Sequence, residues 1–331
     1  MTIDDSVGDL VLVRDLRTRS DTRQRHARAA RAGVEVRVGR GAYLPSDRWD
    51  ALDRRSQHVV RMLAFSRTRR QPPTFSHWSA AAWHGLPMVG AHGGHLHLVV
   101  GRTTGGRSSS GVVAHSLEVP SEDVIASEDM RVTSLLRTAV DLAATAPTPA
   151  AVAVVDHVLR TDGAGHGGSP GTATARDELL AAWERGLPIR GHRRAREVID
   201  FADELSGSPL ESVSRANMHA IGCPQPELQV PFSDGDGLIG IVDFSWPVFG
   251  VVGEADGDLK YLDRKFRSGR SAEQVVLDEK IREDRLRALG LRVIRWRWET
   301  AVDARALRSR LAAAALPMVA RIPWSIGGSS A

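Results

Sequence analysis

Two largely apolar runs around a turn sequence give the stretch 238–257 the pattern of a β-hairpin. Residues 238–246 are mostly apolar and partly β-branched, 247–250 form a turn sequence, and 251–257 resemble a returning strand. A turn centred between Val248 and Phe249 places Asp243 directly opposite Glu254, on one face of the sheet. Because residues two apart in a strand point to the same face, Asp256 is predicted to share a face with Glu254, and Ile239 and Ile241 to share a face with Asp243.

Helical patterns flank this hairpin on both sides. Ser208 is a suitable cap for a helix that begins at Pro209 and carries Glu211 in its first turn. Downstream, 271–289 has the apolar spacing of a longer helix, which Gly290 ends, and 291–298 alternates as a strand. The predicted order is helix, strand, strand, helix, strand, which indicates an α/β unit with acidic residues from the first helix and the hairpin.

The charges of this region indicate phosphodiester chemistry. Two facing carboxylates, Asp243 and Glu254, repel each other unless a cation lies between them or they share a proton. Only three of the 44 Lys and Arg residues are lysine, and all three lie within this region, at Lys260, Lys265 and Lys280. An ammonium is a compact point charge whose pKa shifts readily, so lysine and arginine are not equivalent at a catalytic position. The alternative is a salt-bridged surface without catalysis.

Several short motifs make the stretch from about 205 to 315 resemble a known family. They are Ser208–Ser212, Val242–Pro247, Gly253–Gly257, Lys260–Tyr261, Glu279–Asp284 and Gly290–Trp296. Together they resemble the domain of unknown function related to very-short-patch-repair endonucleases, in the PD-(D/E)xK superfamily. The resemblance implies a restriction-endonuclease-like α/β fold.

The resemblance also implies roles for individual residues. Glu211, Asp243 and Glu254 would bind Mg²⁺ or Mn²⁺, and the ion would polarise a phosphoryl oxygen and acidify the attacking water. Asp256 stands where the superfamily usually has its lysine, so Lys260 or Lys280 would have to supply the ammonium. This departure keeps open a second interpretation, in which the fold is intact and the site is inactive.

The N-terminal segment is strongly basic. Residues 1–70 contain 16 Arg, no Lys and nine Asp or Glu, a formal charge of +7, which leaves −3 for the rest of a chain of net charge +4. The pattern predicts a helix over 10–17, a second helix over 21–32 and a short hairpin over 34–44. This is the arrangement of a winged helix-turn-helix that binds DNA. The predicted DNA-binding residues are Arg23, Arg25, Arg28, Arg31, Arg37 and Arg40. The alternative is a solvated helix face.

The same region resembles the N-terminal domain of AbiEi-type antitoxins. The resemblance rests on the basic helix, on Val38–Tyr43 and on Ser76–Pro87. It implies DNA as a partner, and a cognate toxin protein whose transcription is controlled. The central segment, with strands over 95–100 and 111–116, predicts a mixed α/β unit. A zinc site built from His77, His84, His95 and His97 is disfavoured, because no cysteine or acidic residue stands at ligand spacing.

The predicted fold class is therefore α/β multidomain, with four segments. They are a winged helix over 1–70, a mixed α/β antitoxin-like unit over 71–160, a linker and helix over 161–204, and a PD-(D/E)xK nuclease-like domain over 205–318. A single cysteine, the lack of a signal-peptide pattern and the lack of an 18-residue apolar run predict a cytoplasmic protein that does not enter a membrane.

Three functions remain compatible with the sequence. The first is a DNA-binding protein with a Mg²⁺-dependent endonuclease or nickase domain. The second is a transcriptional regulator or antitoxin with an inactive nuclease-like fold. The third is an RNA-processing nuclease, for which the sequence offers no platform of exposed aromatic residues.

Overall fold

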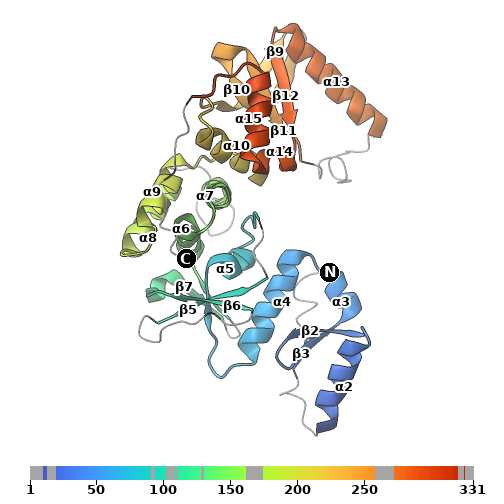
Figure 1. The fold of residues 1–331 in the computed structure, drawn as a ribbon, viewed down its shortest axis with the longest axis vertical. Helices are drawn as coiled ribbons and strands as arrows, with labels where there is room; N and C mark the ends of the chain where they lie inside the picture. Colours follow the sequence, from blue (N-terminus) through green and yellow to red (C-terminus); the bar gives the residue numbers. More distant parts are fainter. Residues whose placement is uncertain are drawn as a thin grey trace. The chain divides into compact units, whose positions relative to one another are not determined.

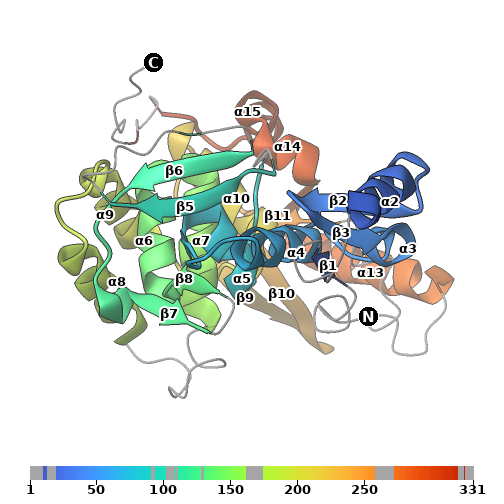
Figure 2. The ribbon, with the colours of Figure 1, turned by 90° about the horizontal axis from the view of Figure 1, so that it is seen from below.

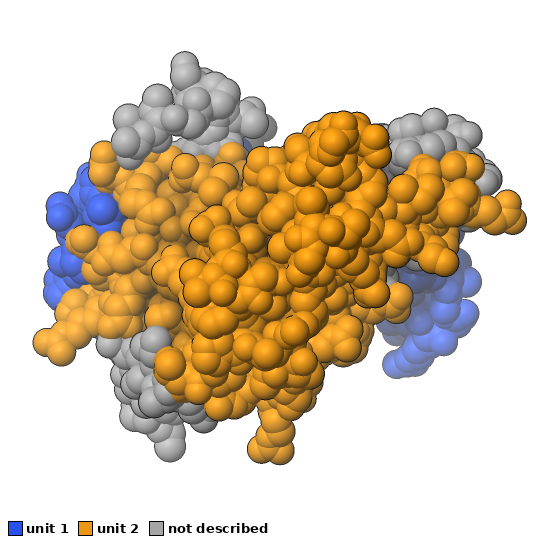
Figure 3. Space-filling model, turned by 90° about the horizontal axis from the view of Figure 1, so that it is seen from above, with its two compact units in different colours: residues 1–142, 178–189 blue, residues 143–177, 190–331 orange. Residues whose placement is uncertain are grey.

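The computed structural model describes residues 10–12, 20–90, 94–101, 108, 111–127, 130–161, 174–257, 272–319 and 324. The chain divides into two compact units, 1–142 with 178–189 and 143–177 with 190–331, which Figure 3 colours separately. The fold is mixed α/β, and the described residues form three β-sheets.

The N-terminal part of the first unit is a small three-stranded sheet with helices (Figures 1 and 2). Its elements are β1 (Val11–Leu12), α2 (Ser20–Arg31), β2 (Glu35–Gly39), β3 (Ala42–Pro45), α3 (Ser46–Asp50) and α4 (Arg54–Arg67). The strand order is β1-β3-β2, and both pairings are antiparallel. Leu12, Leu44, Trp49 and Val60 are among the buried residues of its core.

Two of the three predictions for this segment are confirmed. The structure contains the predicted hairpin, as β2 and β3, and the predicted second helix, as α2. The helix predicted over 10–17 is wrong at its start, since Val11 and Leu12 pair with Tyr43 and Ala42 of β3. Residues 13–19 lie outside the described part of the chain. The short apolar run Leu10 to Val13 fits the periodicity of a helix as well as that of a strand. In the structure, pairing with β3 makes Val11 and Leu12 a strand.

The second part of this unit is a five-stranded sheet with the order β6-β5-β4-β8-β7. The strands are β4 (Thr74–Phe75), β5 (Leu96–Val100), β6 (Val112–Ser116), β7 (Val124–Ala126) and β8 (Arg131–Thr133). The helical elements are α5 (His77–His84), the short 3-10 helix η2 (Ser121–Asp123) and α6 (Leu135–Thr145). Helix α4 belongs to both cores, since Val60 and Ala64 pack in the first and Val59, Met62 and Leu63 in the second.

Further helices follow α6 along the chain, ahead of the C-terminal sheet. They are α7 (Thr148–Thr161), α8 (Thr174–Arg185) and α9 (His192–Phe201). Within the second unit, α7 is joined to α10 (Pro209–Ala220) by a buried ion pair, in which Arg215 Nη2 donates to both oxygens of Asp156 at 3.0 and 3.1 Å. Both partners are at least 95 % buried, so this pair fixes the two helices together.

The C-terminal sheet has four strands in the order β12-β11-β10-β9. Its elements are α10, β9 (Glu227–Asp234), β10 (Gly237–Trp246), η3 (Pro247–Phe249), β11 (Val251–Ala255), α13 (Ala272–Ala288), β12 (Arg292–Trp296), α14 (Trp298–Val302) and α15 (Ala304–Ala313). Strands β9, β10 and β11 are antiparallel neighbours, and β12 runs parallel to β11. The order is helix, three strands, helix, strand, so the sequence prediction omitted β9.

Helices α10 and α13 cover opposite faces of this sheet (Figure 1). On one face, the Trp296 ring packs against Gly253, and Trp296 Nε1 donates to Ser214 Oγ of α10 at 2.8 Å. On the other face, Leu286 of α13 packs in a buried cluster with Val252. Because Val252 and Gly253 are consecutive in β11, they point to opposite faces, and so do the two helices that contact them.

Candidate functional site

The hairpin register agrees with the prediction. Phe244 pairs with Gly253, Ser245 with Val252 and Trp246 with Val251. Continued by one step, this register places Asp243 across from Glu254. The pairing of the ladder ends at Phe244, however, and the two acidic side chains have different partners beyond it.

Glu254 lies on the face that α13 covers. Its side chain is buried and forms ion pairs with Arg282 of α13 and, at 3.0 Å, with Arg295 of β12. Burial raises the pKa of Glu254, and the two guanidinium groups oppose that increase. The charge of Glu254 is therefore already compensated within the protein.

Asp243 faces a different group of residues. Its Oδ2 accepts a hydrogen bond from the Ala255 backbone N–H at 2.8 Å, and its Oδ1 lies 3.5 Å from Gln229 Nε2. The same Gln229 nitrogen donates to Glu211 Oε2 of α10 at 2.9 Å. Asp243 is thus connected to α10, whereas Glu254 is connected to α13. The prediction that the two carboxylates share one face is wrong.

The cause is a local break in strand alternation. Val242 packs with Leu286 on the α13 face, whereas the ring of Phe244 stacks on Trp296 on the α10 face, with ring centroids 5.4 Å apart. Residues two apart in a regular strand share a face, so the backbone is irregular between them. The opposing residue, Gln229, has φ 51°, which is rare for a residue with a side chain. The predicted neighbours of Asp243 are affected too, since Ile239 lies in the α13-face cluster and Ile241 is 54 % exposed.

The acidic residues on the α13 face form a network around one arginine. Arg295 forms ion pairs with Glu254, with Asp256 at 3.5 Å, with Glu279, and with Glu283 at 3.3 Å. Burial opposes ionisation of Glu279, but the hydrogen bond from Arg295 and the nearby Arg282 outweigh it, so the pKa of Glu279 is lowered. These contacts match the salt-bridged alternative that the sequence left open.

The predicted magnesium ligands do not converge on one point. Glu211 and Asp243 lie near Gln229, whose amide N–H group occupies the space between them as a donor, and Glu254 is paired with arginines. Across the residues that the structure describes, no three His, Cys, Asp or Glu side chains are grouped so as to hold a metal ion. Glu254 therefore does not join Glu211 and Asp243 in one site.

The remaining predicted catalytic residues are placed as follows. Asp256, in the position where the superfamily usually has lysine, is paired with Arg295. Lys260 lies outside the described residues, and Lys280 is exposed on α13. Two residues of this region were not predicted from the sequence. Gln229 lies in β9, which Pro231 and the polar residues around it obscured, and the carboxylates that Arg295 contacts are distant from it in sequence.

The predicted DNA-binding arginines lie on α2 and on the hairpin of β2 and β3. Five of them are exposed, namely Arg25, Arg28, Arg31, Arg37 and Arg40. The side chain of Arg23 is outside the described part. At 3.6 residues per turn, Arg25, Arg28 and Arg31 lie within about 120° of one another, and Arg28 lies about 160° from His26. They share the side of α2 that faces away from buried His26.

His26 holds the helix and the hairpin together. Its Nδ1 lies 2.9 Å from Glu35 Oε2 of β2, and its ring stacks on Tyr43 of β3 with centroids 5.4 Å apart. These largely buried contacts join α2 to both strands of the hairpin. The exposed arginines therefore lie on elements that pack against each other.

A histidine stack occupies the central sheet. His77 is buried, has φ 49°, and stacks on His115 with ring centroids 3.5 Å apart, while His97 Nδ1 lies 2.9 Å from His115 Nε2. His84 is separate, with Nε2 2.8 Å from the carbonyl oxygen of Thr133. Burial lowers the pKa of His115 to about 4, and burial together with the other two rings and Arg137 lowers the pKa of His77 well below 6.5.

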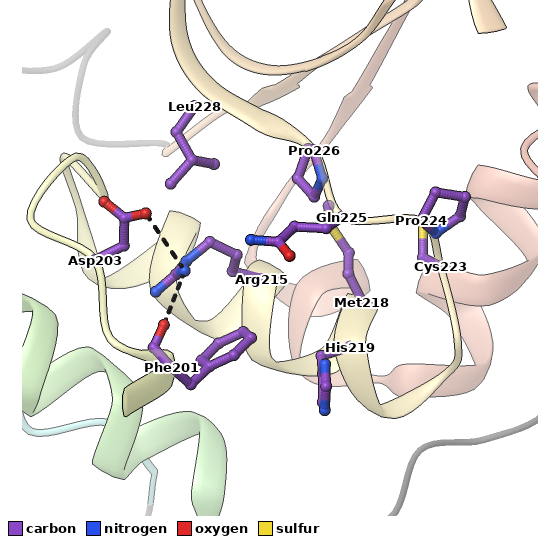
Figure 4. A pocket seen from close by; sticks show the side chains of 10 residues that line it. All are labelled: Phe201, Asp203, Arg215, Met218, His219, Cys223, Pro224, Gln225, Pro226 and Leu228. Atoms are coloured by element: carbon purple, nitrogen blue, oxygen red, sulfur yellow. Dashed lines mark hydrogen bonds and ion pairs between the residues drawn. The ribbon is translucent and has the colours of Figure 1, made fainter. Parts of the chain in front are cut away.

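A small pocket lies beside α10 in the second unit (Figure 4). Its volume is about 40 Å³, and Arg215, His219, Gln225 and Leu228 are among its lining residues. Arg215 Nη1 donates to the Phe201 carbonyl at 3.2 Å, and its Nε is buried without a hydrogen-bond partner. This volume is enough for water, which would satisfy the buried nitrogen.

Comparison with known proteins gives relatives but no family. No family model matches the chain, and no solved structure matches it. Two proteins of Mycobacterium tuberculosis are 32 % identical to it over 157 residues: the uncharacterized protein MT2308 of strain CDC 1551 / Oshkosh and the uncharacterized protein Rv2248 of strain ATCC 25618 / H37Rv. The match covers 47 % of this chain and 51 % of each relative, so the chain spans about half the length of these relatives.

None of the described helices combines the length and the apolar character that crossing a bilayer requires.

Proposed function

We propose that this protein binds DNA through the arginines of α2 and the β2–β3 hairpin and acts as a transcriptional regulator of the antitoxin type. The observation that carries the proposal is the group of five exposed arginines on α2 and on the hairpin that contacts it through His26, namely Arg25, Arg28, Arg31, Arg37 and Arg40. A basic helix followed by a basic hairpin presents one element to the major groove and another to the phosphates beside it. DNA phosphate contacts require charge gathered on one side, and three of these arginines, Arg25, Arg28 and Arg31, share one side of α2.

The strand order of this segment also supports the proposal. In β1-β3-β2, the two strands of the hairpin follow directly on α2, and β1 pairs with the returning strand β3. Of the exposed arginines of the hairpin, Arg40 lies in the turn, and Arg37 lies in β2, where it pairs with Tyr43 of β3. Such a hairpin corresponds to the wing of a winged helix-turn-helix.

The test is a gel shift on the DNA upstream of the protein's own gene. Replacing Arg28 and Arg31 with Ala should weaken binding about tenfold or more, because each charged contact to phosphate contributes on the order of 1 kcal/mol. The matched control removes two exposed arginines of the second unit, Arg287 and Arg305, and should bind as the parent protein does. Equal loss in both double variants would show that only total charge matters, and would contradict the proposal.

The C-terminal unit serves in this proposal as a nuclease-like fold that does not cut. The order α10-β9-β10-β11-α13-β12 supports the resemblance to PD-(D/E)xK proteins. The pairing of Glu254 with Arg282 and Arg295 supports an inactive site, because a metal ion would have to displace two guanidinium groups. A cognate toxin protein is the partner that the antitoxin resemblance implies.

A second proposal, metal-dependent cleavage of a phosphodiester, rests on Glu211 and Asp243. Both carboxylates approach the same Gln229 amide nitrogen, which marks a position where positive charge is favoured. Supercoiled plasmid incubated with Mg²⁺ or Mn²⁺ separates the two proposals. A regulator leaves the plasmid intact with the parent protein, Asp243→Asn and Glu211→Gln alike. Nicking by the parent protein that both variants lose would establish the second proposal in place of the first.

A further inference from the structure

A cavity lies beside the first two turns of α4 in the first unit. Its volume is about 710 Å³. Small-molecule sites are typically about 300–1,000 Å³, so its size suits a ligand of several rings or groups. Arg54, Arg55 and Arg61 line it, together with the apolar side chains of Leu86 and Met88.

The three arginines are held in different ways. Arg55 is anchored by backbone carbonyls, since its Nε donates to Ala82 at 2.7 Å and its Nη2 to Trp83 at 3.4 Å. Arg61 lies over the ring of Trp49, with its guanidinium carbon 5.0 Å from the ring centroid. Arg54 is exposed at the start of the helix. Two of the three guanidinium groups are thus positioned before any ligand arrives.

These arginines form no salt bridge with a carboxylate among the described residues. The hydrogen bond from Ser56 and, to a lesser degree, attraction to the neighbouring Arg55 lower the pKa of Asp53. The acidic residue in the lining, Asp53, uses its Oδ1 to accept the Ser56 backbone N–H at 2.7 Å as the cap of α4. Three positive groups and one engaged carboxylate leave the cavity positive.

The two kinds of lining define the ligand. Guanidinium groups bind phosphate oxygens through charge-assisted hydrogen bonds, and an apolar floor favours a flat or hydrophobic group attached to the phosphates. Leu86 is 3 % exposed and so is a fixed part of the structure, and Met88 packs against the central core. We propose that this cavity binds a nucleoside diphosphate or a closely related nucleotide, with its phosphates on the three arginines and its base against Leu86 and Met88.

Gly94 supports the placement of Arg61. It has φ +63°, and a Cβ added there would lie 3.1 Å from Arg61 Nη1. The lack of a side chain at this position lets Arg61 extend along the cavity wall. This proposal stands apart from DNA binding by α2, because none of the five arginines in that proposal lines the cavity.

The first experiment measures binding of ADP to the full chain by titration calorimetry, with inorganic pyrophosphate and adenosine as the two partial probes. ADP should bind, and pyrophosphate should compete with it, since the phosphates make the charged contacts. Arg54→Ala and Arg61→Ala should each weaken ADP binding about tenfold or more, as expected for loss of a charge-assisted hydrogen bond. Arg70→Ala removes an exposed arginine beyond the end of α4 and should leave ADP binding unchanged.

The second experiment maps the site by modifying arginines with phenylglyoxal and identifying them by mass spectrometry. ADP should protect Arg54 and Arg61 but not Arg28 or Arg31. Thermal melts show whether each variant is folded, and Arg54→Ala, which removes an exposed side chain, should melt as the parent protein does. Failure of ADP and pyrophosphate to bind, or equal ADP binding by parent and both cavity variants, overturns the proposal. Protection of Arg54 and Arg61 by duplex DNA but not by ADP also overturns it, since the arginines would then belong to the DNA surface.

Discussion

Arg295 shows how one residue changes the meaning of a motif. It forms ion pairs with four carboxylates. Glu254 belongs to β11, Asp256 directly follows that strand, and Glu279 and Glu283 belong to α13. In sequence, the acidic residues resemble metal ligands. In the structure, the cation that compensates them is a guanidinium of the neighbouring strand.

Replacing Arg295 with Ala should destabilise the protein. Glu254 is 4 % exposed and would keep only Arg282 as a partner, and breaking a buried ion pair costs about 3 kcal/mol or more. Urea denaturation measures the change in the free energy of unfolding. Arg287→Ala is the control, because its pair with Glu283 is largely exposed and contributes about 0–1 kcal/mol. Equal stabilities of the two variants would mean that the network around Glu254 is not structural.

At the scale of the elements, the sequence predicted those whose pattern is local. Helix α10 follows from its capping Ser208, whose Oγ accepts the Glu211 N–H at 3.2 Å, and the β10–β11 register follows from the position of the turn. Strand β9 was not predicted, because Pro231 is unusual in a strand. Proline is tolerated here because β9 lies at the edge of its sheet. The break of alternation at Asp243 depends on the backbone of Gln229 across the ladder, which no pattern within β10 reveals.

The histidine stack of the central sheet predicts a pH effect on stability. His77 and His115 have pKa values below that of an unfolded histidine, about 4 for His115, so the unfolded chain takes up their protons first as the pH falls. Their contribution to stability is complete above pH 6.5 and is lost as the pH falls from 6.5 towards 4. Buried Asp141, whose pKa burial raises to about 6, acts in the opposite sense, since its contribution is present below 3.8 and is lost as the pH rises through 6.

A comparison of variants separates these opposing effects. His115→Gln should lose less stability than the parent protein between pH 7 and pH 5, because it lacks one titrating ring and relieves the charge facing His77. Thermal melts at the two pH values measure the loss. A parent protein and variant with the same loss would show that the stack does not control the acid sensitivity of this unit.

At the scale of the whole molecule, the distribution of charge predicted more than the catalytic motif did. The formal +7 of residues 1–70 indicated a basic surface, and five of its arginines are exposed on α2 and the hairpin. The acidic site could not be predicted in the same way, because it depends on side-chain directions across a sheet and on arginines from α13 and β12 that are distant in sequence. The nucleotide-binding cavity was not predicted either, since its lining comes from α4 and from the segment that follows α5.

The most direct test of the central claim is the salt dependence of DNA affinity. Each phosphate contact that is lost reduces the slope of log Kobs against log salt concentration by about 0.9. The Arg28→Ala and Arg31→Ala double variant should therefore have a slope smaller in magnitude by about 1.8 than the parent protein. The Arg287→Ala and Arg305→Ala control should keep the parent slope. An unchanged slope in the first variant would show that α2 does not contact DNA phosphates, and would contradict this account.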